Sequence, residues 1–246
     1  MLVAIQIFPV IVKKEIQKGD DLPKLFLSNF KDLRDGDVIV ISQKAVSKQE
    51  GRMVELGMVI PSLLAVGIAS EYKKDPKLVE VILSESQRIV RMENGVLITQ
   101  TKHGFVCANA GVDESNMPLG FVSLLPENPD KSAHKFAHVI QEKTKKKVAV
   151  LISDTFGRPF REGQTNCAVG VAGINAIDHY EGKKDSFGRT LRVTAIAQAD
   201  EICGAAELVM KKTKDCPFAV VRGLEFEPSE GGVDSLIRKK ETDLFR

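Results

Sequence analysis

The sequence predicts an α+β fold in which helices flank a mixed sheet, and two observations support this class. Runs rich in β-branched residues and runs with helical periodicity both occur along the 246 residues, but they do not alternate in a regular strand–helix–strand order. No GxGxxG sequence follows the first strand-like run, which disfavours a Rossmann fold. We expect two lobes that divide near residues 127–130, where PENPD is typical of a turn before a helix.

Each element is predicted from its own pattern. The uncharged run Met1–Val12 is too short to cross a membrane, and Leu2–Val10 within it predicts a first strand. Further β-branched runs predict strands at Asp37–Ser42, Val96–Thr101, Lys147–Ser153, Cys167–Ala172, Arg189–Ala197 and Phe218–Arg222. Apolar residues at helical spacing predict helices at Leu22–Asp32, Pro76–Arg91, Lys131–Lys145, Asp200–Lys212 and Val233–Lys240.

Composition limits the classes of function. Hydrophobic residues make up 43% and charged residues 28% of the chain, as in ordinary globular proteins. A net charge of +2 is no electrostatic footprint for a nucleic-acid-binding protein. The four cysteines are scattered singly, which matches neither a zinc site nor a disulfide framework and favours reduced thiols. We therefore expect a cytoplasmic protein with no nucleic-acid or membrane partner.

A basic segment follows the second predicted strand. In SQKAVSKQEGR, residues Lys44, Lys48 and Arg52 lie four apart and share one face if the segment is helical. Such a face can hold a phosphate chain, and a solvated basic face balanced by Glu50 is an equal alternative. The chain carries no GxxxxGK[ST] phosphate loop, no GxSxG elbow and no HExxH motif, so any nucleotide is held without these common cradles.

Two further segments concentrate polar residues where the chain leaves an apolar run. CANAGVDESN contains Asp113, Glu114 and Asn116, more oxygen ligands than a simple turn requires. In ISDTFGRPFREG an apolar strand delivers Asp154 and Thr155 at its end. A carboxylate beside a hydroxyl can hold a hard divalent cation.

Two arginines, Arg158 and Arg161, follow in the same segment and can neutralise the phosphate oxygens that such a cation bridges. The alternative is that Asp154 caps a turn and pairs with Arg158.

Together these segments resemble the coenzyme F420-0:L-glutamate ligase family, the GTP-dependent γ-glutamyl ligases that add glutamate to a deazaflavin coenzyme. The resemblance makes residues 1–246 one domain of this type. The matching blocks occur in the family's order and are DGDVIVISQKAVSKQEGR, GFVCANAGVDESN, LISDTFGRPFREG, INAIDHYEGKKDSFGRTLRVTAIAQADEICGAAELVMKK, AVVRGL and LIRKKETDLFR.

The resemblance implies roles for individual residues. Asp113, Asp154 and Thr155 match the family's divalent-metal positions, while Lys48 and Asn116 match positions that contact the guanine nucleotide. The implied cations are Mg²⁺ or Mn²⁺, with K⁺ as a further candidate. The implied partners are GTP, L-glutamate, coenzyme F420-0 and a second copy of the chain in a homodimer.

The implied reaction begins when GTP phosphorylates the terminal carboxylate of the deazaflavin, and the glutamate amine then attacks the acyl phosphate. Lys44 and Lys48 would bind GTP, and Arg158 and Arg161, the candidate catalytic residues, would spread the remaining charge. Two alternatives stay open: a metal-dependent phosphohydrolase that uses water as acceptor, and a regulatory module that binds GTP without turnover.

Two segments depart from the family pattern. Some members carry an EGLP-like nucleotide-contacting segment after the first strand, where this chain has Ile11–Lys14. In one branch a glycine and an acidic or amide residue stand where this chain has Lys211 and Lys212, so a metal ligand at Lys212 is not expected. Some members are fused to a flavin-reductase-like C-terminal domain, which we do not expect here.

Overall fold

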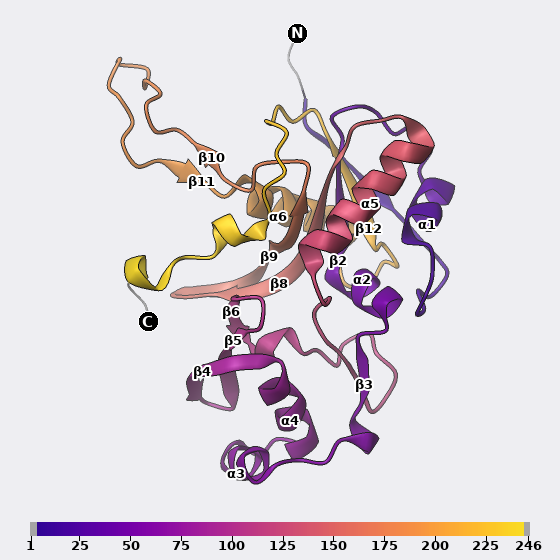
Figure 1. Ribbon diagram of the computed structural model, residues 1–246, viewed down its shortest axis with the longest axis vertical. Helices are drawn as coiled ribbons and strands as arrows, with labels where there is room; N and C mark the ends of the chain where they lie inside the picture. Colours follow the sequence, from indigo (N-terminus) through magenta and orange to yellow (C-terminus); the bar gives the residue numbers. More distant parts are fainter. Residues whose placement is uncertain (1–3, 244–246) are drawn as a thin grey trace.

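A five-stranded mixed sheet forms the centre of the structure, a computed structural model that describes residues 4–243. Its strand order is β1 (Gln6–Val10), β12 (Phe218–Arg222), β2 (Val38–Ser42), β8 (Ala149–Arg158) and β9 (Arg161–Ala172). β2 and β8 run parallel, whereas the other neighbours are antiparallel (Figure 1). The α+β class predicted from the sequence is therefore confirmed.

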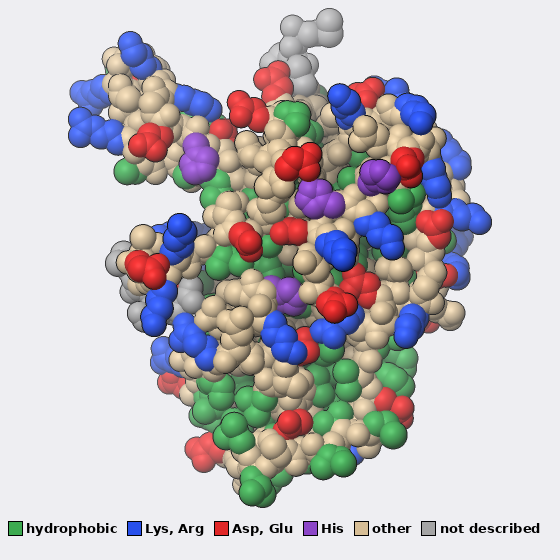
Figure 2. Space-filling view, viewed as in Figure 1, with side chains coloured by type: hydrophobic (Ala, Val, Ile, Leu, Met, Phe, Trp, Pro, Cys, Tyr) green, Lys and Arg blue, Asp and Glu red, His purple; other side chains and the backbone are tan. Residues whose placement is uncertain are grey.

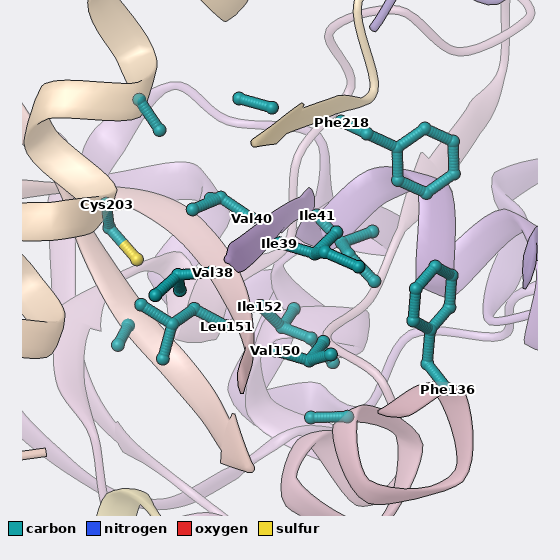
Figure 3. Close-up of a cluster of buried hydrophobic side chains, with 14 of the residues drawn as sticks. Val38, Ile39, Val40, Ile41, Phe136, Val150, Leu151, Ile152, Cys203 and Phe218 are labelled. Atoms are coloured by element: carbon teal, nitrogen blue, oxygen red, sulfur yellow. The ribbon is translucent and has the colours of Figure 1, made fainter. Parts of the chain in front are cut away.

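Helices cover both faces of this sheet. α5 (Pro129–Thr144) packs on β8 and β9 and is joined by α1 (Leu22–Asn29), while α6 (Gln198–Met210) packs on β1, β9 and β12. Figure 3 shows Cys203 of α6 beside Val38 and Leu151, with Phe136 of α5 on the other side of β2. Burial on both faces explains why β2 is a continuous apolar run.

A smaller lobe carries a second hydrophobic core. It contains α3 (Leu63–Tyr72), α4 (Pro76–Ser84), the three-stranded sheet of β4 (Ser86–Glu93), β5 (Val96–Thr101) and β6 (Val106–Ala108), and the pair β3 (Met53–Glu55) and β7 (Phe121–Ser123). Its fully buried side chains include Ala65, Val79, Ile82, Leu97 and Val122. These residues all lie between positions 56 and 124 of the chain. The lobe boundary near 127–130 stays a prediction.

Several predicted elements are confirmed. β5 and β12 have the predicted bounds, and α2 (Gln43–Glu50) is a helix that carries Lys44 and Lys48 of the predicted basic face. Arg52, the third predicted member of that face, lies beyond the end of α2 and pairs with Glu85 at 2.6 Å. The helix ends at Gly51, whose φ of 73° is unfavourable for residues with a side chain. The predicted first strand is observed from Gln6, and its first residues, Leu2 and Val3, lie outside the described range.

The predicted helix Pro76–Arg91 is wrong in its second half. α4 ends at Ser84, where the hydroxyls of Ser84 and Ser86 bond to main-chain carbonyls of the last turn at 2.8 and 2.6 Å. The chain then forms a hairpin of β4 and β5 around Asn94 and Gly95, both at positive φ. Asn-Gly is a strong hairpin signal, and tertiary pairing outweighed the apolar periodicity.

Three other expectations need correction. Only Ala195–Ile196 (β11) of the predicted strand Arg189–Ala197 is extended in a ladder, paired with β10 (Asp178–His179) in a projecting arm (Figure 1). Val233–Lys240 begins with a short 3-10 turn, Val233–Leu236, instead of an α-helix, and α1 ends at Asn29. Two-residue ladders and single turns bury too little apolar surface to produce a strong sequence pattern.

None of the helices within residues 4–243 has both the length and the hydropathy that a membrane span requires.

Candidate functional site

A cleft of about 940 Å³ opens where the parallel pairing of β2 with β8 ends. Because Ser42 and Ser153 are the last pair of this parallel ladder, the residues that follow them, in α2 and in the outer part of β8, meet at the same edge of the sheet. The loop after η2, a short turn at Asn109–Gly111, and the segment after α6 close the other sides. Six of the predicted site residues line this cleft, namely Lys44, Lys48, Asp113, Asn116, Asp154 and Thr155.

Asp113 is held by an ammonium group and by its own loop. Lys44 Nζ lies 2.7 Å from Asp113 Oδ2, and the Ser115 N–H donates to Asp113 Oδ1 at 2.8 Å. The Ser115 hydroxyl also donates to Asp113 Oδ2 at 2.9 Å. Burial alone would raise the pKa of Asp113, but the hydrogen bonds from Lys44 and Ser115 hold it below its usual value. The carboxylate is thus ionised and oriented.

Asp154 lies partly exposed at the end of the apolar part of β8. Burial raises its pKa to about 6, and the nearby charge of Asp113 acts in the same direction. The Thr155 N–H and the ammonium groups of Lys212 and Lys44 oppose this rise. A carboxylate that is costly to ionise gains from a bound cation, so the position favours one.

A chain of polar groups fixes Thr155. The Thr155 hydroxyl donates to Asn166 Oδ1 at 2.7 Å, and Asn166 Nδ2 donates to Ser153 Oγ at 3.0 Å and to Glu207 Oε2 at 3.2 Å. Lys212 Nζ donates to Thr155 Oγ1 from the cleft side. Asn166 is buried, so this network is a fixed part of the floor.

The predicted nucleotide-contacting residues stand on two walls. Lys48, on α2, forms an ion pair with Glu15 at 3.2 Å, and both residues line the cleft. Asn116 lies in the left-handed region with φ of 56°, and its side-chain amide points to the Lys212 carbonyl at 3.4 Å. Both side chains therefore line the same cleft, Lys48 from α2 and Asn116 from the segment between β6 and β7.

The two predicted catalytic arginines lie beyond the cleft lining. Arg158 and Arg161 pair at the turn of the β8–β9 hairpin, and Arg158 Nη2 donates to the Glu162 carbonyl at 2.7 Å. Between them and the floor, Phe156, Gly157 and Gln164 line the cleft. The structure thus places the arginines at the end of the hairpin whose inner part lines the cleft, and their catalytic role stays a prediction.

The donor set fits a hard divalent cation. Asp113, Asp154 and Thr155 supply carboxylate and hydroxyl oxygens, which Mg²⁺ and Mn²⁺ prefer. Within residues 4–243 no cluster of three or more His, Cys, Asp or Glu side chains is suited to a metal. Mg²⁺ is commonly bound through one or two carboxylates together with substrate phosphates, so a pair of acids suits a metal that arrives with a nucleotide.

Sequence reasoning missed Asn166 and Glu207. Asn166 immediately precedes the strand predicted to start at Cys167, and the hairpin extends the strand to Arg161. Glu207 lies on the buried side of α6, between Cys203 and Met210 at helical spacing. A charged residue on an otherwise apolar helix face was the available signal.

Comparison with known proteins identifies close relatives. A family model described as F420-0:Gamma-glutamyl ligase matches residues 11–223. The chain is 46% identical over 235 residues to the coenzyme F420:L-glutamate ligase of Methanothermobacter thermautotrophicus, covering 93% of each chain. It is 41% identical over 250 residues to that of Methanopyrus kandleri, covering 100% and 99%. The corresponding ligase of Archaeoglobus fulgidus is 40% identical over 243 residues, covering 98% and 96%.

Proposed function

This chain belongs to the F420-0:gamma-glutamyl ligase family, and we propose that it joins L-glutamate to the deazaflavin coenzyme F420-0 with cleavage of GTP. Family membership makes it a ligase of coenzyme F420 biosynthesis. GTP dependence and an acyl phosphate are our proposal for how the amide is formed. The relatives are coenzyme F420:L-glutamate ligases, and their names supply the two substrates, the coenzyme and glutamate.

The observation that supports this proposal best is the meeting of acids and bases in one cleft. Three separate segments, α2, the loop after η2 and β8, bring Lys44 and Lys48 opposite Asp113 and Asp154 in a space of about 940 Å³. A nucleoside triphosphate needs both kinds of group, because the lysines bind phosphate oxygens directly and the aspartates bind the accompanying cation. Asn116 adds a polar contact for the base or sugar.

Activation is needed because a carboxylate is a poor electrophile. In the proposed first step an oxygen of the acceptor carboxylate attacks the γ-phosphorus of GTP, the bond to the β,γ-bridging oxygen breaks, and GDP leaves. In the second step the glutamate amine attacks the acyl carbon, phosphate departs, and the amine loses a proton as the amide forms. The net products are amide, GDP and phosphate.

The chain's own residues position and neutralise charge in these steps. Lys44 and Lys48 bind phosphate oxygens, and Asp113, Asp154 and Thr155 would hold Mg²⁺ or Mn²⁺, with K⁺ as a further cation of the site. A divalent cation, when bound there, neutralises charge that develops on the phosphate oxygens. Asn166 keeps the Thr155 hydroxyl oriented throughout.

We assign Arg158 and Arg161 to the acceptor side. The β8–β9 hairpin leads from Asp154 through Phe156 and Gly157 to these arginines, so a long acceptor whose carboxylate lies at the floor would extend toward them. Their guanidinium groups would then neutralise its anionic tail.

We also propose a homodimer. Exposed apolar side chains gather at the lower end of the molecule in Figure 2, on and before α3. They include Met58, Ile60, Leu63 and Leu64, of which Leu63 is 92% exposed. An apolar patch of this kind is typical of a protein interface. Light scattering after gel filtration should give twice the mass of one chain.

Mass spectrometry tests the proposed reaction. The protein is incubated with GTP, L-glutamate, Mg²⁺ and glutamate-free coenzyme, and the product is weighed. We expect the coenzyme mass to increase by one glutamyl unit, with none formed when GTP is omitted. A phosphohydrolase would release phosphate without that product, and a regulatory module would bind GTP without turnover.

A further inference from the structure

Lys212 reaches the floor of the cleft because α6 ends abruptly. The helix stops at Met210, and Lys211 takes φ of 51° and ψ of 163°, an uncommon conformation for a residue with a side chain. This bend directs the next residue back toward the sheet. Lys212 Nζ consequently contacts Thr155 Oγ1, 57 positions away in the chain.

The direction of the Thr155 hydroxyl is fixed by the polar groups beneath it. A carboxylate accepts hydrogen bonds, so the Asn166 amide nitrogen must face Glu207 Oε2, at 3.2 Å. Its carbonyl oxygen then faces Thr155 and accepts the hydroxyl proton at 2.7 Å. The lone pairs of Thr155 Oγ1 are therefore presented to the cleft, where a cation can use them.

An ammonium group already uses this acceptor. Lys212 contacts Thr155 Oγ1 and lies close enough to Asp154 to favour its ionised form, as Lys44 does for Asp113. Each of the two proposed metal-binding acids, Asp113 and Asp154, therefore lies near a lysine. Lys212 is exposed and carries a flexible four-carbon stem, so its ammonium can move to another anion at low cost.

We propose that Lys212 is a tethered cation that competes with divalent metal for Thr155 and Asp154 until the phosphate oxygens of a nucleoside triphosphate draw its ammonium group away. The inference rests on the proposed function, since it requires the metal to bind at these residues. Its consequence is that metal and nucleotide bind cooperatively, and the cleft disfavours metal alone. Coupling of this kind is reciprocal, so metal also strengthens nucleotide binding.

Manganese binding provides a test that is independent of turnover. MnCl₂ is titrated into the full chain after EDTA treatment and dialysis, and free Mn²⁺ is measured by electron paramagnetic resonance, with and without a non-hydrolysable GTP analogue. Without nucleotide, Lys212→Gln should bind Mn²⁺ about tenfold more tightly than the wild type, because one positive charge no longer repels a dication a few ångströms away. With the analogue, the two proteins should agree within about twofold.

Lys211→Gln is the matched control, since it removes the same charge from the neighbouring position of the cleft lining. Its affinity for Mn²⁺ without nucleotide should stay within about twofold of the wild type. The inference is overturned if Lys212→Gln and the wild type bind Mn²⁺ equally tightly without nucleotide while both bind it with the analogue. It is also overturned if Lys211→Gln gains as much affinity for Mn²⁺ as Lys212→Gln does. Failure of every protein to bind Mn²⁺ with the analogue contradicts the metal assignment itself.

Discussion

Lys44 Nζ lies 2.7 Å from Asp113 Oδ2, and this ion pair joins the start of α2 to the loop after η2 in the lining of the cleft. The two residues are 69 positions apart, and most of the smaller lobe lies between them in the chain. Closing that distance makes a basic segment and an acidic segment parts of one site. Sequence alone had presented them as two separate candidates.

Replacement of either proposed metal-binding acid should abolish turnover. We expect Asp113→Asn and Asp154→Asn each to lower kcat by about 100-fold or more, because an amide is a weaker ligand than a carboxylate and carries no charge. Circular dichroism should show an unchanged fold. Glu114→Gln is the matched control, since Glu114 lies in the same loop but is not among the lining residues. Full activity of either Asn variant at limiting Mg²⁺ would show that the replaced acid does not bind the metal.

Asp154→Asn should also stabilise the metal-free protein at neutral pH. Burial raises the pKa of Asp154 to about 6, so between about pH 4 and 6 the folded state holds a proton that the unfolded state has lost. Wild-type stability therefore increases as the pH falls through about 6, whereas the variant does not titrate there. We expect the variant to be about 1–2 kcal/mol more stable at pH 7, after allowance for solvent screening.

Urea unfolding in EDTA at several pH values measures this difference. The advantage of Asp154→Asn should shrink toward zero as the pH approaches 4. A stability difference that is constant with pH, or one that grows as the pH falls, would contradict the raised pKa.

Lys48→Ala should weaken GTP binding by about 1.5–3 kcal/mol, as expected for the loss of a charge-assisted hydrogen bond. Lys48 lines the cleft, and its present partner, Glu15, is a surface carboxylate that a triphosphate can replace. Calorimetric titration with a non-hydrolysable analogue measures the effect. Lys24→Ala on α1 removes the same charge at an exposed site and should leave binding unchanged. An unaltered dissociation constant for Lys48→Ala would show that Lys48 belongs to a solvated basic face of α2 and does not bind the nucleotide.

Arg222→Ala should destabilise the fold by about 3–5 kcal/mol, because it leaves a buried carboxylate without its partner. Arg222 donates to both oxygens of Asp37 at 2.8 Å, and Asp37 is only 1% exposed. Arg34→Ala is the control, since Arg34 pairs with Asp32 at the surface, where such pairs contribute about 1 kcal/mol or less. Denaturant unfolding compares them, and equal losses would show that burial of Asp37 carries no special cost.

Elements that bury a regular apolar pattern were predictable from the sequence. β2, β5 and β12 follow this rule, because each packs against a hydrophobic core and its buried positions are therefore apolar or small. β4 was missed because an apolar periodicity continues past Ser84, while the pairing that makes it a strand is with β5, which follows Asn94 and Gly95. The outer half of the β8–β9 hairpin is polar and exposed, so no apolar alternation marks it.

The candidate site was predictable only in part. Asp113, Asp154 and Lys48 stand in segments richer in polar residues than turns require, and family blocks assigned them roles. Asn166 acts through hydrogen bonds to three residues brought together by the fold, and no spacing in the chain reveals that meeting. The contact of Lys212 with Thr155 likewise depends on the bend at Lys211.

The most direct measurement of the central claim is phosphate release from GTP, followed together with product mass, in the presence and absence of each co-substrate. Acyl phosphates hydrolyse readily, so the site should exclude water until the amine is bound. The account predicts one phosphate released per glutamyl unit added, with slow release when either glutamate or coenzyme F420-0 is omitted. Equally fast phosphate release without glutamate, or no gain of a glutamyl unit, would contradict the ligase mechanism and leave a metal-dependent phosphohydrolase in its place.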